Sequence, residues 1–197
     1  MYQLLFGFSA PSESSGCGLS RRVVFRVMNK FQNEDFADII KSNSQFVTNF
    51  EDEHLTGTAR RGLAIVTCMD SRINPLAVVG MKSGDAKILR NAGARVTDDM
   101  LRTLVLATYL LGVERVLVMP HTDCRMASGG EDSIHRSIED KHGVDTRQVE
   151  FKMVTDQRAA LAADVASIRG FEILPKTLKV AGAIYDVKSG RLEFIDC

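Results

Sequence analysis

Short apolar runs rich in β-branched residues alternate with helix-length segments along most of this chain, and no other feature constrains its fold as strongly. The runs have the length of buried strands rather than of helices. Neighbouring parallel strands need a long crossover connection, usually a helix, so this order predicts a parallel α/β sheet. The strand candidates are 63–67, 86–89, 115–119, 149–154, 178–185 and 192–195.

The segments between the runs carry helix signals. In 98–111, Thr97 is a candidate N-cap, two aspartates follow in the positive first turn, and Gly112 comes after the end. The segment 156–169 begins near Asp156 and is the second predicted helix.

The two ends of the chain complete this prediction. The stretch 31–50 is expected to hold one or two helices, and the last two strands, joined by Lys188-Ser189-Gly190, to form an antiparallel hairpin. The predicted fold class is therefore α/β: about four parallel strands and a C-terminal antiparallel strand, flanked by helices.

Composition limits the kinds of partner. The 197 residues suit a single domain, and Lys plus Arg equals Asp plus Glu at 25 each, which gives no sign of a nucleic-acid partner. No apolar run approaches the roughly 18 residues of a membrane span. Four scattered cysteines predict reduced thiols and a cytoplasmic protein rather than a disulfide scaffold. We expect residues 1–30 to be a poorly ordered arm or one that wraps a partner subunit, with a transit peptide as the weaker alternative, and 31–197 to be the catalytic domain.

Three predicted strands end in polar or small residues. They are followed by Cys68-Met69-Asp70-Ser71-Arg72, by Arg90-Asn91-Ala92-Gly93-Ala94 and by Pro120-His121-Thr122-Asp123-Cys124. Ligands of an open α/β sheet bind beyond the carboxyl ends of its strands, so these segments are expected to face one space. The small residues of the second segment would let the backbone approach a bound molecule, which makes Asn91, Ala92 and Gly93 candidates for lining a substrate pocket.

Cys68, His121 and Cys124 form a candidate metal site. Two thiolates and one imidazole suit tetrahedral zinc, and three protein ligands leave the fourth position open, as in catalytic sites. The alternative is two inert buried cysteines and an unrelated histidine. Sequence patterns of a deaminase, a thioredoxin-like motif and phosphate-binding glycine loops are absent from the chain.

Asp70 and Arg72 complete the candidate site. Two thiolates cancel the charge of Zn²⁺, so a bound water is acidified less than it is by zinc with neutral ligands, where its pKa falls to about 7. A fixed carboxylate that accepts a hydrogen bond from the hydroxide would orient the nucleophile, and a guanidinium two residues along can hold that carboxylate. The alternative is an exposed ion pair worth less than about 1 kcal/mol.

In order and spacing, these three segments resemble the β-class carbonic anhydrases, over about residues 31–197. The segment Gly182-Ala183-Ile184-Tyr185-Asp186 resembles the closing strand of the family. The missing long insertion and the short entry Gly84-Asp85-Ala86-Lys87 resemble its small, archaeal-type branch. The resemblance implies zinc held by Cys68, His121 and Cys124, and reversible hydration of carbon dioxide to bicarbonate and a proton by zinc-bound hydroxide. It also implies that Asp70 and Arg72 form the dyad that orients the hydroxide.

The resemblance also implies features that the residues alone do not. One is a homodimer, often paired into a dimer of dimers. Another is a closed state in which Asp70 is the fourth zinc ligand. Two residues depart from the family pattern of glycines, namely Pro120 and Arg125. We expect Arg125 to pair with Asp123 or Glu131; steering bicarbonate or narrowing the entrance are the alternatives.

Other functions and roles stay open at this stage. The same scaffold could hydrolyse carbonyl sulfide or carbon disulfide, or the chain could be a zinc-binding homologue without turnover or a redox sensor acting through its two site thiols. His54, His135 and His142 are candidate proton shuttles because histidine titrates near neutral pH, although surface histidines are the expected reading. Asp123 is expected to bond the N–H groups of its own turn.

Overall fold

The computed structural model describes residues 33–197, and the chain divides into two units, Met1–Phe50 and Glu51–Cys197. The described part of the first unit consists of the 3₁₀ helix η1 (Asn33–Phe36) and helix α1 (Ala37–Val47). This confirms the helices expected in 31–50. Helix α1 buries none of its residues, including its apolar ones. The predicted arm, residues 1–30, lies outside the described residues, so the predicted boundary after residue 30 stays a prediction.

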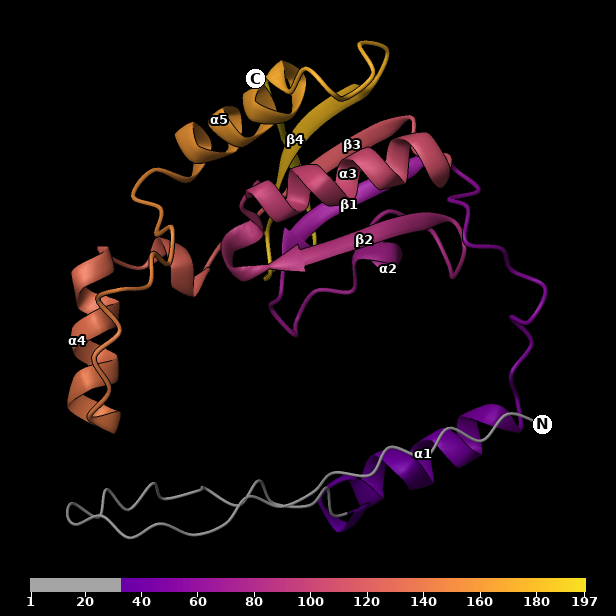
Figure 1. Cartoon of the computed structure of the whole chain (residues 1–197), viewed down its shortest axis with the longest axis horizontal. Coiled ribbons are helices and arrows are strands. Elements are labelled where there is room, and N and C mark those ends of the chain that lie inside the picture. The colour runs from indigo at the N-terminus through magenta and orange to yellow at the C-terminus, as the bar shows by residue number, and fades with distance from the viewer. Residues whose placement is uncertain (1–32) are drawn as a thin grey trace, which may run out of the picture. The chain divides into compact units, whose positions relative to one another are not determined.

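The second unit is built on one five-stranded sheet with the order β2-β1-β3-β4-β5 (Figure 1). The first four strands are parallel to their neighbours, and β5 pairs antiparallel with β4. This confirms the predicted fold class and the C-terminal hairpin. The strands are β1 (Leu63–Cys68), β2 (Ala86–Asn91), β3 (Arg115–Met119), β4 (Lys179–Tyr185) and β5 (Leu192–Ile195).

Strand β1 lies between β2 and β3, and all six of its residues are buried. Ala64 and Val66 belong to the core beneath helices α3 (Asp98–Leu110) and α5 (Gln157–Gly170), whereas Leu63 and Ile65 belong to the core on the opposite face. A strand covered on both faces has no solvent-facing position, which is why the apolar run from Leu63 to Val66 lacks alternation. Burying one such side chain contributes about 1.5–3 kcal/mol.

The register places the carboxyl ends of the central strands level with one another. Cys68 at the end of β1 pairs with Asn91 at the end of β2, and Thr67 pairs with Met119 at the end of β3. The hydroxyl of Thr67 also donates to the Met119 carbonyl oxygen at 2.8 Å. The segments that follow β1, β2 and β3 therefore start from the same edge of the sheet.

One predicted strand is absent from the structure, and two of its helices were not predicted. The segment 149–154 is not a strand: Lys152 has a left-handed φ of 57°, and the N–H of Val154 donates to the carbonyl oxygen of Met126 rather than to a neighbouring strand. Helix α4 (Glu131–His142) was not predicted, because its sequence is largely polar and it buries only His135.

The one predicted helix cap, Thr97, is not formed by its side chain, whereas the second predicted helix has a side-chain cap. Asp156 caps α5, its carboxylate accepting from the N–H groups of Arg158 and Ala159. Thr97 stands at the N-cap position of α3, but its side chain makes no capping hydrogen bond. A short helix, α2 (Pro75–Val78), follows β1 and was not predicted. Among residues 33–197, no helix is long and apolar enough to cross a bilayer.

Candidate metal centre

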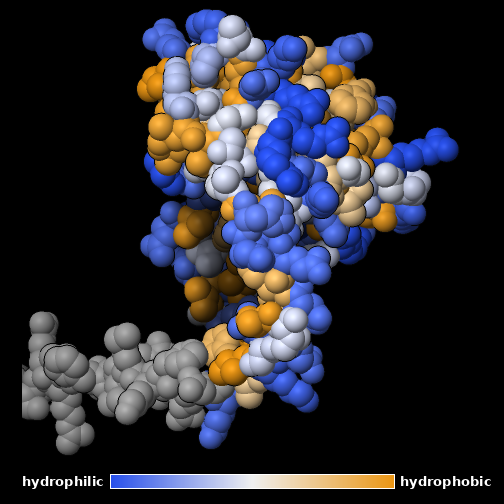
Figure 2. All heavy atoms as spheres, turned by 90° about the vertical axis from the view of Figure 1, so that its right-hand side faces the viewer, coloured by the Kyte–Doolittle hydropathy of each residue, from blue (hydrophilic) through white to orange (hydrophobic). Residues whose placement is uncertain are grey.

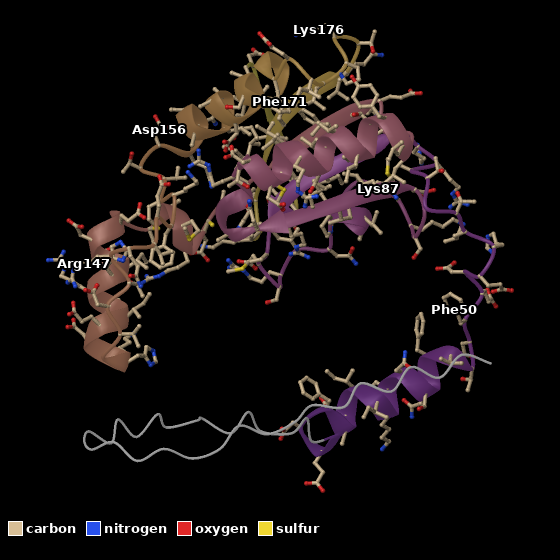
Figure 3. All side chains as sticks on the ribbon, viewed as in Figure 1. Phe50, Lys87, Arg147, Asp156, Phe171 and Lys176 are labelled. Carbon is tan, nitrogen blue, oxygen red and sulfur yellow. The ribbon has the colours of Figure 1, made fainter. Side chains whose placement is uncertain are left out.

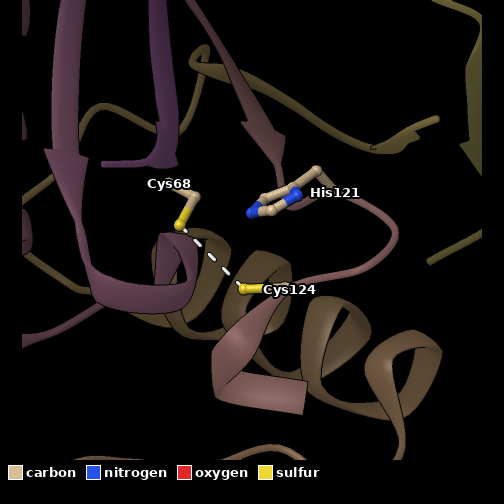
Figure 4. Close-up of side chains that lie close together, drawn as sticks. All are labelled: Cys68, His121 and Cys124. Atoms are coloured by element: carbon tan, nitrogen blue, oxygen red, sulfur yellow. Dashed lines mark hydrogen bonds between the residues drawn. The ribbon is translucent and has the colours of Figure 1, made fainter. Parts of the chain in front are cut away.

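Cys68, His121 and Cys124 come together at the carboxyl edge of the sheet (Figure 4). One ligand atom of each lies within 4.8 Å of the others, and the two Sγ atoms are 4.0 Å apart. Their exposed fractions are 5%, 0% and 7% in that order. Side chains from the ends of two strands thus converge on one enclosed point.

The His121 ring is oriented by its own turn. Its Nδ1 lies 2.8 Å from the carbonyl oxygen of Thr122, which can only accept, so Nδ1 carries the hydrogen and Nε2 has the free lone pair. Within residues 33–197, Nε2 is the only buried side-chain nitrogen or oxygen without a hydrogen-bond partner. Leaving a buried polar atom unpaired costs about 1–3 kcal/mol, and a metal ion would satisfy it.

The two thiols also fit a bound cation. Burial and, to a smaller degree, the neighbouring Cys68 raise the pKa of the Cys124 thiol to about 11. Without a cation the Cys124 sulfur would stay protonated near neutral pH. A set of two sulfurs and one imidazole nitrogen is characteristic of tetrahedral zinc. The residues present therefore fit the zinc ion that the sequence predicted.

Hydrogen bonds to other elements hold the second half of the site. The backbone N–H of Thr122 donates to the Tyr185 carbonyl oxygen, and the N–H of Tyr185 to that of Pro120, both at 2.9 Å. Pro120 thus serves as an acceptor only, so its missing N–H is not needed. Gln157, at the start of α5, donates to the His121 carbonyl oxygen at 2.7 Å. Nothing in the sequence identified Gln157, because α5 is distant along the chain.

Asp70 and Arg72 form a close pair beside the three ligands. The guanidinium donates from Nε to Oδ1 at 3.0 Å and from Nη2 to Oδ2 at 2.7 Å, and the Arg72 backbone N–H donates to Oδ1 at 2.9 Å. These bonds, the side-chain ones first, hold the pKa of Asp70 well below its usual range, so the carboxylate stays ionised. Its Oδ2 lies 3.7 Å from His121 Nε2. The structure therefore brings the predicted dyad to the predicted ligands.

Asp123 and Arg125 behave differently from prediction. Asp123 has a left-handed φ of 56°, and its carboxylate accepts from Nη1 of Arg72 at 2.8 Å rather than from N–H groups of its own turn. The predicted pairing of Arg125 with Asp123 or Glu131 is wrong. Arg125 donates to Ser128 at 3.4 Å, and the Glu131 carboxylate accepts from the Phe151 N–H. Both acids are already engaged elsewhere.

The end of strand β2 supports the site from a third strand. The Arg90 guanidinium donates to three backbone carbonyls of the turn that carries the first ligand, those of Cys68, Asp70 and Ile73, at 2.9, 2.6 and 3.3 Å. No role was predicted for Arg90, because the carbonyls it binds carry no sequence signal.

Asn91, Ala92 and Gly93 follow, and their predicted part in a substrate pocket stays a prediction. The amide of Asn91 closes its own turn by bonding the backbone N–H and carbonyl of Arg95. Gly93 (φ 80°) lies in the 3₁₀ helix η2 (Ala92–Ala94), and a Cβ there would come within 3.1 Å of the Met126 Cβ.

The three shuttle candidates have different surroundings. His135 is buried, not at the surface as expected; its Nδ1 lies 2.8 Å from the Thr146 hydroxyl and its ring packs against Phe151. His54 is exposed and bonds the Glu51 carbonyl oxygen, and His142 is exposed at the end of α4. A shuttle role for any of them stays a prediction.

Known proteins are similar to this chain in sequence over most of its length. A family model described as carbonic anhydrase matches residues 63–192. The β-carbonic anhydrase 1 of Mycobacterium tuberculosis is 33% identical over 159 residues, which cover 79% of this chain and 94% of that protein. A carbon disulfide hydrolase of Acidithiobacillus thiooxidans is 30% identical over 152 residues, covering 67% of this chain and 76% of that protein.

Solved structures agree with the sequence comparison. A crystal structure of a carbonic anhydrase from Streptococcus mutans superposes with a TM-score of 0.76 at 34% identity, covering 85% of this chain and 99% of that one. The fold and site thus define an α/β protein with a candidate Cys2His metal centre. The chain belongs to the β-class carbonic anhydrase family, which confirms the resemblance seen in the sequence and the expectation of an enzyme of that family.

Proposed function

We propose that this protein is a zinc enzyme that reversibly hydrates carbon dioxide to bicarbonate and a proton. The observation that carries the proposal is the unpaired, fully buried Nε2 of His121, enclosed with two buried sulfurs and lying 3.7 Å from an ionised carboxylate. A purely structural zinc site has no use for such a carboxylate. Membership of the carbonic anhydrase family supports the same reaction.

In this proposal the side chains have separate roles. Cys68, His121 and Cys124 hold the zinc, which when bound supplies Lewis acidity and an activated water. Asp70 accepts the hydrogen bond that orients the nucleophile toward the carbon of the substrate. Arg72 keeps that carboxylate ionised and fixed in direction, because its Nε and Nη2 each hold one carboxylate oxygen.

The proposal is tested by measuring zinc content and carbon dioxide hydration on the same preparation. We expect one zinc per chain and stopped-flow hydration that is lost when a chelator removes the metal and returns with added zinc. Full zinc content without hydration at alkaline pH would instead favour a zinc-binding homologue that lacks turnover.

A second candidate reaction is hydrolysis of carbon disulfide or carbonyl sulfide. It is favoured by one observation, the similarity to proteins named carbon disulfide hydrolase, one of them 30% identical to this chain. Both substrates are linear triatomic molecules that would meet the same zinc site. Hydration of carbon dioxide and release of sulfide from carbon disulfide, measured side by side, separate the two reactions.

We further propose that the enzyme is a cytoplasmic homodimer or a dimer of dimers. Support comes from α1, because exposed apolar surface of this kind marks a site of protein–protein contact. Its exposed apolar side chains are Ile39, Ile40, Phe46 and Val47. Apolar surface is visible on the molecule in Figure 2. Ile40→Asp should lower the mass measured by light scattering toward that of one chain, whereas Lys41→Asp on the same helix should not. An unchanged mass in the first variant would contradict this role of α1.

A further inference from the structure

The Asp70–Arg72 pair has a third member that comes from the metal turn. The Arg72 guanidinium has two bonding edges, and Asp70 occupies the one formed by Nε and Nη2. Nη1, on the other side, donates to Asp123 Oδ2 at 2.8 Å, and Nη2 also reaches the Asp123 carbonyl oxygen at 3.1 Å. Within residues 33–197, the structure shows no other acceptor for Nη1.

The contact links Arg72 to the metal site because Asp123 lies in the turn that carries two of the candidate ligands. Asp123 lies between His121 and Cys124, so its place is set by the same turn that presents two of the three candidate ligands. That turn is fixed further by a bond between the Val187 N–H and the Thr122 hydroxyl at 3.2 Å. The bond from Arg72 to Asp123 therefore joins two segments 51 residues apart, one carrying the dyad and the other the metal turn.

We propose that Asp123 is a positioning residue that clamps the Arg72 guanidinium and thereby fixes the direction of the Asp70 carboxylate beside the metal site. A guanidinium held on one edge can rotate about its last side-chain bonds, but one held on both edges cannot. When the ligand turn is in place, Asp123 is in place and the dyad is assembled with it. This inference rests on the function proposed above for Asp70 and Arg72.

The backbone conformation of Asp123 decides which variants test the inference. At a φ of 56°, alanine would add backbone strain, whereas glycine adopts this conformation freely. Asp123→Gly therefore removes the carboxylate without straining the turn, and Asp123→Asn keeps an oxygen that accepts from Nη1. The matched control is Glu139→Ala, which removes the carboxylate that accepts at 2.5 Å from Nη2 of another arginine, Arg147.

Three quantities are measured on each variant: zinc content, the kcat and KM of hydration, and the nitrogen-resolved NMR signals of the Arg72 guanidinium. In Asp123→Gly we expect zinc to be kept and kcat to fall roughly 10-fold with little change in KM, the lower end of what partners of metal-site residues contribute. The separate Nη signals of Arg72 should merge as rotation becomes free. Asp123→Asn should restore most of both readouts, and Glu139→Ala should change neither.

An unchanged kcat or unchanged Arg72 signals in Asp123→Gly would overturn the inference, and so would an Asn variant as impaired as the Gly variant. A double-mutant cycle covers the case of a poorly folded Gly variant. Arg72→Lys loses the fork, so adding Asp123→Gly to it should lower kcat per zinc-bound chain no further, whereas additive losses would contradict the clamp. If the wild-type protein lacks hydration activity, the proposed function fails, while the Arg72 signals still decide whether the clamp exists.

Discussion

Two Asp-x-Arg turns of this chain, at residues 70–72 and 145–147, fold alike. In each, the arginine backbone N–H donates to Oδ1 of the aspartate two residues earlier, at 2.9 Å in the first turn and 3.0 Å in the second. In each, the guanidinium bonds the same aspartate and also a second carboxylate, which is Asp123 in the first turn and Glu139 in the second. Locally, the two turns differ little.

Their surroundings differ greatly. The Asp70 side chain is 18% exposed, follows a strand that is buried throughout, and lies 3.7 Å from a buried imidazole nitrogen. The Asp145 side chain is 64% exposed, and its turn lies beside the polar helix α4 (Figure 3). The local sequence of each turn is therefore enough to form the ion pair, whereas the neighbouring strands decide whether that pair faces a reactive site.

The largest effect is expected from Cys124→Ser. This variant removes a candidate metal ligand, and with it the metal site that distinguishes the surroundings of the first turn from those of the second. A ligand loss should lower zinc affinity by more than the roughly 10–100-fold that outer partners contribute, and it should also destabilise the fold because metal binding contributes folding energy. Zinc content and thermal unfolding measure both effects. Cys197→Ser, at the exposed C-terminus, is the matched control and should change neither. Full zinc content in Cys124→Ser would reject the ligand assignment.

Neutralising the aspartate of each turn in separate proteins tests the comparison directly. Asp70→Asn should keep zinc but lose hydration by about 100-fold or more, within the range that a positioned acid–base or orienting group supplies. Asp145→Asn should leave hydration unchanged. Equal activity in the two variants would show that the first turn is no more than an ion pair.

Removing the arginine of each turn should change the pKa of the aspartate in the first turn but not in the second. The side-chain bonds of Arg72 are the largest cause of the lowered pKa of Asp70, so Arg72→Ala should raise that pKa toward the usual value of about 3.9. The backbone N–H of Arg147 is the largest cause for Asp145, and Arg147→Ala keeps it, so the pKa of Asp145 should stay low. Carboxyl-carbon NMR titration in the acid range measures both.

The sign of the effect on stability follows from these directions. A lowered pKa in the folded state stabilises the protein above the unfolded pKa of about 3.9, and this contribution is lost as the pH falls through the folded value. Arg72→Ala should therefore reduce stability near neutral pH more than in acid. Equal pKa changes for Asp70 and Asp145 would contradict the distinction between side-chain and backbone bonds.

The smallest effect is expected from Arg147→Ala on the free energy of unfolding. Its bonds to Asp145 and Glu139 lie at the surface, and exposed pairs contribute less than about 1 kcal/mol. Urea unfolding measures it. A loss of several kcal/mol would mean that the second turn holds α4 in place and is more than a surface ion pair.

Much of the fold could be predicted because the composition of strand β1 and its neighbours indicates buried strands. A run apolar at every position needs cover on both faces, and only crossover helices supply it. Helix α4 was missed for the opposite reason: it buries only His135, so it shows no apolar periodicity. The segment 149–154 was misjudged because β-branched residues also occur in irregular segments that bond to loops, as Val154 does to Met126.

The candidate ligands could be predicted because cysteine and histidine at strand ends are chemically distinctive. The residues that hold the site could not, since the contacts of Arg90 and Gln157 involve backbone carbonyls, which every residue possesses. Asp123 was named but misassigned for a related reason. Its neighbours along the chain suggested a local turn, and its partner Arg72 lies 51 residues earlier.

The sequence by itself determined the parallel sheet, the nature of the ligand set and the local form of both Asp-x-Arg turns, because each depends on residue type and short spacing. Only the tertiary structure decided that Asp70 lies beside His121 while Asp145 lies in solvent, and that Asp123 reaches Arg72. The physical reason is that strand order and register bring distant segments to one edge of the sheet, and no local pattern records that order.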